Sequence, residues 1–130
     1  MRIPLANQLK KRQQVETAFL QDEIIRLVYL TTEDMVLHGG TAIWRCYSGK
    51  RFSEDLDFYS STFPSITKQF KKIGSSQGLS IIKMKDTGNV IFSTIANGRT
   101  TVKLEINHSK HVEGSITTYE VLPTIILEST

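Results

Sequence analysis

The apolar residues near the start of the chain recur at the spacing of an α-helix. Residues 5–30 contain no glycine or proline, and one side of this segment carries a stripe of apolar residues: Val15, Ala18, Phe19, Ile25 and Val28. A stripe of this kind is typical of a helix that packs on a core. The pattern therefore predicts one long amphipathic helix from about Leu5 to Leu30.

Short apolar runs and chain breakers alternate in the next segment. Residues 34–38 are largely apolar and stop at Gly39-Gly40, which predicts a buried strand that ends in a tight turn. A short helix is expected over residues 41–47. Residues 55–59 then alternate polar and apolar positions, as a half-buried strand does. This alternation assigns two side chains to the core, those of Leu56 and Phe58.

The second half of the chain predicts a helix followed by an antiparallel meander. Ser65 is expected to cap a helix that ends near Gly74. Asn97-Gly98 is a strong signal for a two-residue hairpin. Four strands are expected in this half: Leu79–Lys85, Val90–Ile95, Arg99–Asn107 and a short one within residues 116–122. The pattern as a whole predicts one α/β domain of the α+β type over residues 1–130, with a mixed twisted sheet and flanking helices.

Composition and charge narrow the class of protein without deciding its function. A chain of 130 residues with 39% apolar and 22% charged residues resembles an ordinary folded domain. The formal charge of +3 is compatible with nucleotides or RNA as partners, but it is far from the dense basic stripe of a dedicated nucleic-acid binder. Cys46 is the single cysteine, so an internal disulfide is excluded. Without a leader or a long apolar run, we expect a cytoplasmic protein with no membrane association.

Two aspartates in the predicted strand 55–59 form the first candidate site. Successive side chains of a strand alternate between faces, so Asp55 and Asp57 would point the same way, about 6.6 Å apart along the strand. Two carboxylates that close are unfavourable unless a proton or a cation lies between them, and Mg²⁺ prefers such oxygen ligands. The pair predicts a metal site, although two exposed acids on a solvent-facing strand are the commoner origin of an Asp-x-Asp pattern.

A glycine turn and a third acid add to this candidate site. Gly39, Gly40 and Thr41 lie between a predicted strand and a predicted helix, which aims backbone N–H groups and the helix dipole at an anion. Glycine lets the backbone approach a phosphate closely, and the threonine can add a hydroxyl donor. Glu105 can supply a third carboxylate. Three acids can hold two cations about 3.5–4 Å apart, one to activate a hydroxyl and one to neutralise a triphosphate and its leaving pyrophosphate.

Three segments carry a signature that is more specific than any of these residues alone. They are Leu37-His38-Gly39-Gly40-Thr41-Ala42-Ile43, Arg51-Phe52-Ser53-Glu54-Asp55-Leu56-Asp57-Phe58 and Lys103-Leu104-Glu105-Ile106. Together they strongly resemble the AbiEii/AbiGii abortive-infection toxins of the polymerase-β-like nucleotidyltransferase superfamily. The resemblance runs from about Val15 to the end of the chain. It implies a minimal nucleotidyltransferase fold, in which the glycine turn holds a nucleoside triphosphate and the acids bind Mg²⁺ or Mn²⁺.

The resemblance also implies roles and a reaction. The catalytic and metal-binding roles fall on Asp55, Asp57 and Glu105, and nucleotide binding falls on Gly39, Gly40, Thr41, Arg51, Ser53 and Lys103. For Arg51 a guanidinium matches phosphate geometry, but a structural salt bridge explains it equally well. The implied reaction transfers a nucleoside monophosphate from the triphosphate to an acceptor hydroxyl, on RNA such as tRNA or on a protein. Such a toxin would act with a cognate antitoxin.

Two alternatives stay open on the sequence. Members of the family continue into a helical C-terminal region with further polar residues, and this chain stops before it. It can therefore be a truncated, non-catalytic module that binds a nucleotide or an antitoxin. A metal nuclease would use similar acids, but Lys103 precedes Glu105, opposite to the common nuclease order, and the glycine turn has no role in that chemistry. We expect His38 to be a packed residue at the end of a strand, and His108 to lie in a polar loop.

Overall fold

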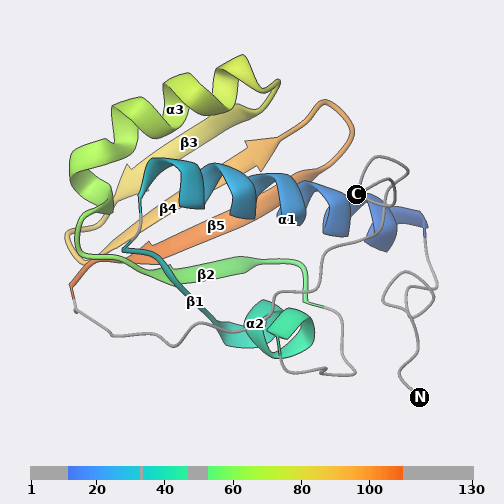
Figure 1. Ribbon diagram of the computed structural model, residues 1–130, viewed down its shortest axis with the longest axis horizontal. Coiled ribbons are helices and arrows are strands. Elements are labelled where there is room, and N and C mark those ends of the chain that lie inside the picture. The colour runs from blue at the N-terminus through green and yellow to red at the C-terminus, as the bar shows by residue number, and fades with distance from the viewer. Residues whose placement is uncertain (1–11, 33, 47–52, 110–130) are drawn as a thin grey trace.

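The computed structural model describes residues 12–32, 34–46 and 53–109, and for residues 43–46 it describes the backbone alone. Within these ranges the chain forms one five-stranded sheet with helices packed on it (Figure 1). The helices are α1 (Arg12–Thr31), α2 (Gly39–Cys46), the 3-10 helix η2 (Phe63–Ile66) and α3 (Thr67–Ser76). The strands are β1 (Val36–His38), β2 (Leu56–Tyr59), β3 (Ser80–Asp86), β4 (Val90–Ala96) and β5 (Thr101–Asn107). The predicted α/β class, with a mixed sheet and flanking helices, is confirmed.

The strands are ordered β1-β2-β5-β4-β3 across the sheet. β3, β4 and β5 form the antiparallel meander that the sequence predicts, and β1 pairs with β2 in the antiparallel sense. β2 and β5 run parallel, which makes the sheet mixed. Parallel neighbours need a long crossover connection, and here it consists of η2, α3, β3 and β4. Residues far apart in the sequence therefore meet at the centre of the sheet.

The hydrophobic core lies between one face of the sheet and the helices α1 and α3, which cover that face in Figure 1. The alternation in β2 is confirmed, because Leu56 and Phe58 are fully buried. β5 alternates in the same way, and its core-facing side chains are at most 2% exposed: Val102, Leu104 and Ile106. Phe63 and Phe70 are also buried, and their rings pack edge to face with centroids 5.1 Å apart. Each fully buried side chain of this size contributes about 1.5–3 kcal/mol. No described helix covers the opposite face of β4 and β5, which we call the open face.

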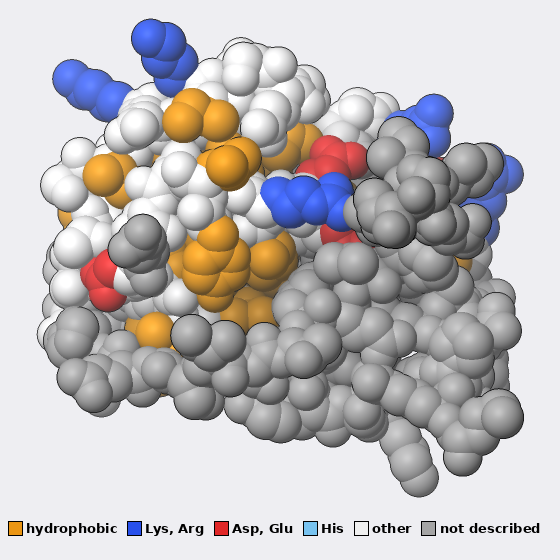
Figure 2. Space-filling model, in the orientation of Figure 1, with side chains coloured by type: hydrophobic (Ala, Val, Ile, Leu, Met, Phe, Trp, Pro, Cys, Tyr) orange, Lys and Arg blue, Asp and Glu red, His pale blue; other side chains and the backbone are white. Residues whose placement is uncertain are grey.

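The helical side of the molecule exposes some apolar residues that the core does not use. Figure 2 views this side and shows apolar side chains gathered in the middle of the described surface. On α1 two large apolar side chains are exposed, Tyr29 at 48% and Leu30 at 63%. The hydroxyl of Tyr29 donates a hydrogen bond to the carbonyl oxygen of Met35 at 3.1 Å. Of the helices in the described part of the chain, none is long and apolar enough to cross a bilayer.

Three local predictions are wrong in detail. β1 is half-buried instead of buried, because it is the edge strand of the sheet. Ser65 does not cap a helix: it lies inside η2, where its hydroxyl donates to the carbonyl oxygen of Thr62. The loop between β4 and β5 has four residues instead of two, because the Asn97 side chain accepts hydrogen bonds from the backbone N–H groups of Arg99 and Thr100.

Other element boundaries agree with the pattern to within a few residues. α1 is present from Arg12 onward, and residues 5–11 of the predicted helix lie outside the described ranges. α3 continues to Ser76, past the predicted end at Gly74. Gly74 is buried, and a Cβ atom there would lie 2.8 Å from Cδ1 of Ile81, so this glycine lets α3 approach β3. The strand expected within residues 116–122 falls on residues that the structure does not describe.

Candidate active site on the open face of the sheet

Strand register brings three polar side chains into one row across the sheet. Asp57 on β2 is paired with Glu105 on β5 and, on its other side, with His38 on β1. Paired residues of neighbouring strands lie on the same face, and neighbouring strands are about 4.8 Å apart. Because Leu56, Phe58 and the apolar residues of β5 point into the core, this row lies on the opposite, open face.

Electrostatics show that Asp57 and Glu105 are close enough to interact. Partial desolvation, then the negative charge of Asp57 and a hydrogen bond with Asp57, raise the pKa of Glu105 above its usual value of 4.5. Asp55 raises the same pKa to a smaller extent. Like charges held in this way are relieved by a proton or by a cation. Carboxylates that repel one another offer only oxygen ligands, and such ligands suit a hard divalent cation such as Mg²⁺.

Asp55 lies just outside β2, so strand pairing does not place it as it places Asp57 and Glu105. It precedes Leu56, the first residue of the strand, and its side chain is exposed. Across the described ranges no three His, Cys, Asp or Glu side chains converge closely enough to hold an ion as they stand. The structure therefore contains a close pair, Asp57 and Glu105, with Asp55 beside it.

The glycine turn packs directly against this acidic pair. Gly39 has a φ of +79°, and a Cβ atom built on it would lie 2.7 Å from Oδ2 of Asp57. A Cβ atom on Gly40 would lie 2.9 Å from Oγ of Ser53. Both distances are shorter than an ordinary contact, so a Cβ atom at either position would force the backbone or the facing side chain to shift. Since α2 begins at Gly39, the N–H groups of its first turn have no partner within the helix and lie next to the acidic pair.

Thr41 ties the start of α2 to the start of β2. Its side chain is fully buried, and its hydroxyl donates a hydrogen bond to the backbone carbonyl oxygen of Asp55. In this structure the hydroxyl proton is thus used to hold the acidic strand. The backbone N–H groups of the first turn of α2, rather than this hydroxyl, are therefore the potential donors to an anion.

A residue that the sequence analysis missed supports the segment before Asp55. Gln21 lies in the apolar face of α1 and is completely buried. Its side-chain amide donates to the carbonyl oxygens of Ser53 at 2.7 Å and of Glu54 at 2.9 Å. The signal was present in the sequence, because a glutamine within an apolar helical stripe needs buried acceptors. Gln21 is therefore a positioning residue for the acidic segment.

Of the two remaining predicted site residues, Lys103 and Arg51, the structure describes only Lys103. Lys103 is exposed on the open face, because it precedes Glu105 by two positions on β5. Arg51 lies outside the described residues. His38, expected to be packed, stacks on Tyr59 with ring centroids 4.0 Å apart and an interplanar angle of 23°. Tyr59 lies two positions after Asp57 on β2 and therefore on the same, open face.

Comparison with known proteins identifies a family with this arrangement. The profile of the family described as nucleotidyl transferase AbiEii toxin, type IV TA system, matches residues 28–125. One similar solved structure is MenT4, a nucleotidyltransferase toxin from Mycobacterium tuberculosis, with a TM-score of 0.59 and 17% identity; the alignment covers 92% of this chain and 55% of that one. Another is JHP933 from Helicobacter pylori, with a TM-score of 0.58, 23% identity and coverages of 88% and 53%. A search of curated proteins gives no match.

These comparisons establish the fold and the family separately. At 17% and 23% identity, the two solved structures show the fold of the chain, and the match to MenT4 makes it the fold of a nucleotidyltransferase toxin, as the sequence predicts. This chain spans 55% and 53% of the lengths of those two proteins. The family profile covers about three quarters of the chain and includes the glycine turn and all three acids. The chain therefore belongs to the nucleotidyl transferase AbiEii toxin family of type IV toxin–antitoxin systems.

Proposed function

We propose that this chain is the nucleotide-binding and metal-binding core of a toxin that transfers a nucleoside monophosphate from a nucleoside triphosphate to an acceptor hydroxyl. Membership of a nucleotidyltransferase toxin family supports the reaction class. The observation that carries the proposal is the register that sets Asp57 beside Glu105 while Gly39 packs against Asp57. A phosphate site and an acidic site are thereby joined in one small region.

The glycine turn is the proposed phosphate site. The first-turn N–H groups of α2 can donate to phosphate oxygens, and the absence of side chains at Gly39 and Gly40 allows the phosphates to come close. Ser53, whose hydroxyl lies against Gly40, can add a donor. Lys103 adds positive charge on the same face as Glu105. We keep Arg51 as a further phosphate contact, because a guanidinium binds phosphate in a bidentate manner.

Asp55, Asp57 and Glu105 are the proposed ligands of Mg²⁺ or Mn²⁺. When bound, such an ion would neutralise the triphosphate and lower the pKa of the attacking hydroxyl. In the reaction the hydroxyl oxygen bonds to the α-phosphorus, the bond to the bridging oxygen breaks, pyrophosphate leaves and the hydroxyl proton is released. The residues of this chain hold the reactants, since Gly39 and Gly40 fix the phosphates and Gln21 and Thr41 fix the segment that carries Asp55.

The acceptor is proposed to be RNA, such as tRNA, or a hydroxyl of a protein, and the partner a cognate antitoxin. The antitoxin is supported by membership of a family of type IV toxin–antitoxin systems, and the acceptor by the reaction class alone; neither rests on a contact in the described ranges. A module that binds a nucleotide or an antitoxin without transferring anything is the second candidate.

Radiolabel transfer tests the proposal. The protein is incubated with each α-labelled nucleoside triphosphate, Mg²⁺ or Mn²⁺ and total RNA, with EDTA as the control for metal. Label on RNA or on protein is expected with the cation and not with EDTA. Asp57→Asn should lower transfer by more than about 100-fold, since even the groups that support metal ligands are worth 10–100-fold. Asp86→Asn, in the hairpin between β3 and β4, is the matched control and should leave transfer unchanged.

Two results would overturn parts of this assignment. Undiminished transfer by Asp57→Asn would place the reaction away from the acidic pair. Binding of a triphosphate by the wild-type protein with no transfer of label to RNA or protein would instead leave the non-catalytic module as the function of this chain.

A further inference from the structure

An aromatic side chain stands exposed on the open face, one strand away from the acidic pair. Phe92 on β4 is paired with Glu105 on β5, so the two side chains lie on the same face. Phe92 is 44% exposed, and on the neighbouring strand β3 Ile82 is 43% exposed. Ile82 is paired with Thr94, which shares the face of Phe92. Two large apolar side chains on adjacent strands beside a candidate active site favour a binding surface over scattered exposure.

The order of the site residues across the sheet shows from which side an acceptor would approach the acidic pair. From β1 to β4 the row runs from the glycine turn through Asp57 and Glu105 to Phe92. Each step between strands is about 4.8 Å. If the phosphates lie at the glycine turn beside Asp57, an attacking hydroxyl has to approach from the other side of the acidic pair, which is the side of Phe92. The molecule that carries this hydroxyl would therefore lie over β4.

Two lysines lie near the exposed ring, on the strands to either side of β4, and Glu105 is its direct neighbour on β5. Lys85 on β3 is paired with Phe92, and Lys103 on β5 is paired with Thr94, so both lysines lie on the open face. Both are exposed, and in the described ranges neither takes part in an ion pair. Lysines beside an aromatic ring are the usual arrangement for single-stranded nucleic acid, because bases stack on the ring while phosphates meet the positive charge.

We propose that Phe92, flanked by Lys85 and Lys103, is the platform on which the terminal base of a single-stranded RNA acceptor stacks, with its terminal hydroxyl directed toward Glu105. This inference rests on the proposed nucleotidyl transfer and assigns the acceptor to a place on the sheet. A protein acceptor offers no planar base to the ring and no row of phosphates to the lysines. Phe92 is thus a positioning residue for the acceptor, while the glycine turn on the far side of Asp57 serves the triphosphate.

Binding in the absence of turnover tests the platform independently of catalysis. A fluorescent single-stranded oligoribonucleotide of about 12 nucleotides is titrated in EDTA and followed by anisotropy. Phe92→Ala should weaken binding by about 5- to 150-fold, which corresponds to the 1–3 kcal/mol that a stacked base contributes. Phe92→Tyr keeps a ring and should bind like the wild type. Leu30→Ala removes an apolar side chain of α1 that is 63% exposed, against 44% for Phe92, and is the matched control.

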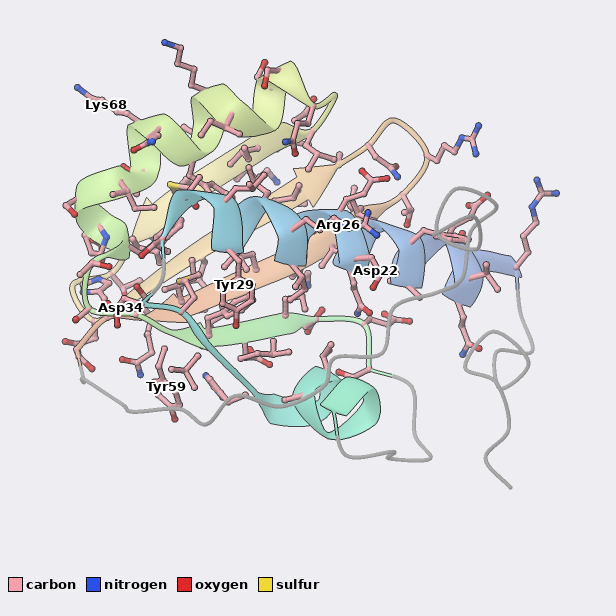
Figure 3. All side chains as sticks on the ribbon, viewed as in Figure 1. Asp22, Arg26, Tyr29, Asp34, Tyr59 and Lys68 are labelled. Atoms are coloured by element: carbon pink, nitrogen blue, oxygen red, sulfur yellow. The ribbon has the colours of Figure 1, made fainter. Side chains whose placement is uncertain are left out.

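Salt dependence tests the lysines, and kinetics separate the two substrates. Lys85→Gln should reduce the slope of log affinity against log salt by about 0.7, the value for one phosphate contact on a single strand. Lys68→Gln, on the outer side of α3 in Figure 3, should leave the slope unchanged. In the transfer assay, Phe92→Ala should raise the KM for the RNA acceptor and leave the KM for the triphosphate as it is.

The outcomes for the platform and for the proposed function are distinct. Wild-type binding of the oligoribonucleotide by Phe92→Ala overturns the platform, even if transfer to another acceptor is normal. Binding of a deoxyoligonucleotide but not of the RNA, or an effect of Phe92→Ala on a protein acceptor alone, also overturns it. RNA binding that depends on Phe92 without any transfer of label supports the platform and rejects the nucleotidyl transfer.

Discussion

Replacement of Gly39 by alanine gives a direct test of the contact between the glycine turn and Asp57. Gly39 has a φ of +79°, which costs an alanine about 1–2 kcal/mol relative to glycine. In addition, the new Cβ atom would lie 2.7 Å from Oδ2 of Asp57. Either the backbone shifts, at a cost of about 1–3 kcal/mol, or the Asp57 carboxylate rotates away. Both responses move the residue that links the phosphate site to Glu105.

Gly78 provides a matched control for the backbone strain alone. Its φ of +81° is nearly that of Gly39, but a Cβ atom there would meet nothing within 4 Å. Gly78→Ala should therefore lower the free energy of unfolding by about 1–2 kcal/mol and leave nucleotide binding unchanged. Gly39→Ala should lower it by about 2–5 kcal/mol if the backbone shifts, and should weaken the binding of a triphosphate in either case.

Urea unfolding and the titration of a fluorescent triphosphate analogue in Mg²⁺ measure these two effects. The two variants are expected to differ in their affinity for the triphosphate, whatever their difference in stability. If Gly39→Ala binds the triphosphate like Gly78→Ala and unfolds at the same urea concentration, the close approach to Asp57 has no energetic consequence. The glycine turn would then lose its proposed role as the phosphate site.

Two further predictions concern contacts that support the sheet. Gln21→Leu removes two hydrogen bonds to the segment before Asp55 and should lower the free energy of unfolding, measured in urea, by about 1–3 kcal/mol. The control Gln69→Leu, on the exposed side of α3, should change this free energy by less than about 0.5 kcal/mol. Equal effects of the two substitutions would contradict the importance of the buried contact. The hydrogen bonds from His108 and from the N–H of Gly88 lower the pKa of Asp86 from its usual 3.8. The ionised Asp86 side chain thus stabilises the fold above pH 3.8, and this stabilisation is lost as the pH falls through the lowered pKa of the folded state. The difference in Tm between the wild type and Asp86→Asn should therefore shrink in acid. A difference in Tm that does not depend on pH would refute this role of Asp86.

The parts of the fold that sequence could predict are those encoded in short windows. Alternation over a few residues was enough to place Leu56 and Phe58 in the core. The predicted length of the hairpin loop was wrong because the Asn97 side chain accepts hydrogen bonds from the backbone N–H groups of Arg99 and Thr100, which lengthens the loop. A residue pattern signals that a turn is present more reliably than it signals how many residues the turn contains.

The candidate site could be predicted as a set of residues but not as an arrangement. The two aspartates and the glycine turn lie within 20 positions of one another, and their proximity follows from local order. The pairing of Asp57 with Glu105 joins strands that are separated by η2, α3 and two further strands, so nothing local specifies it. Gln21 and Phe92 were missed for the same reason, since their importance depends on which strands and segments lie beside them.

The parallel register between β2 and β5 connects the stability of the core to the chemistry of the site. Leu104 and Ile106 on β5 are at most 2% exposed, and Glu105 lies between them on the opposite face. A slip of one residue would send Glu105 into the core and place these two side chains on the open face. Exposing two side chains of this size costs about 3–6 kcal/mol, before the cost of burying a carboxylate beneath α1 is counted. The same burial that holds β5 in the sheet therefore holds Glu105 beside Asp57, and the acidic pair needs no further contact to fix its register.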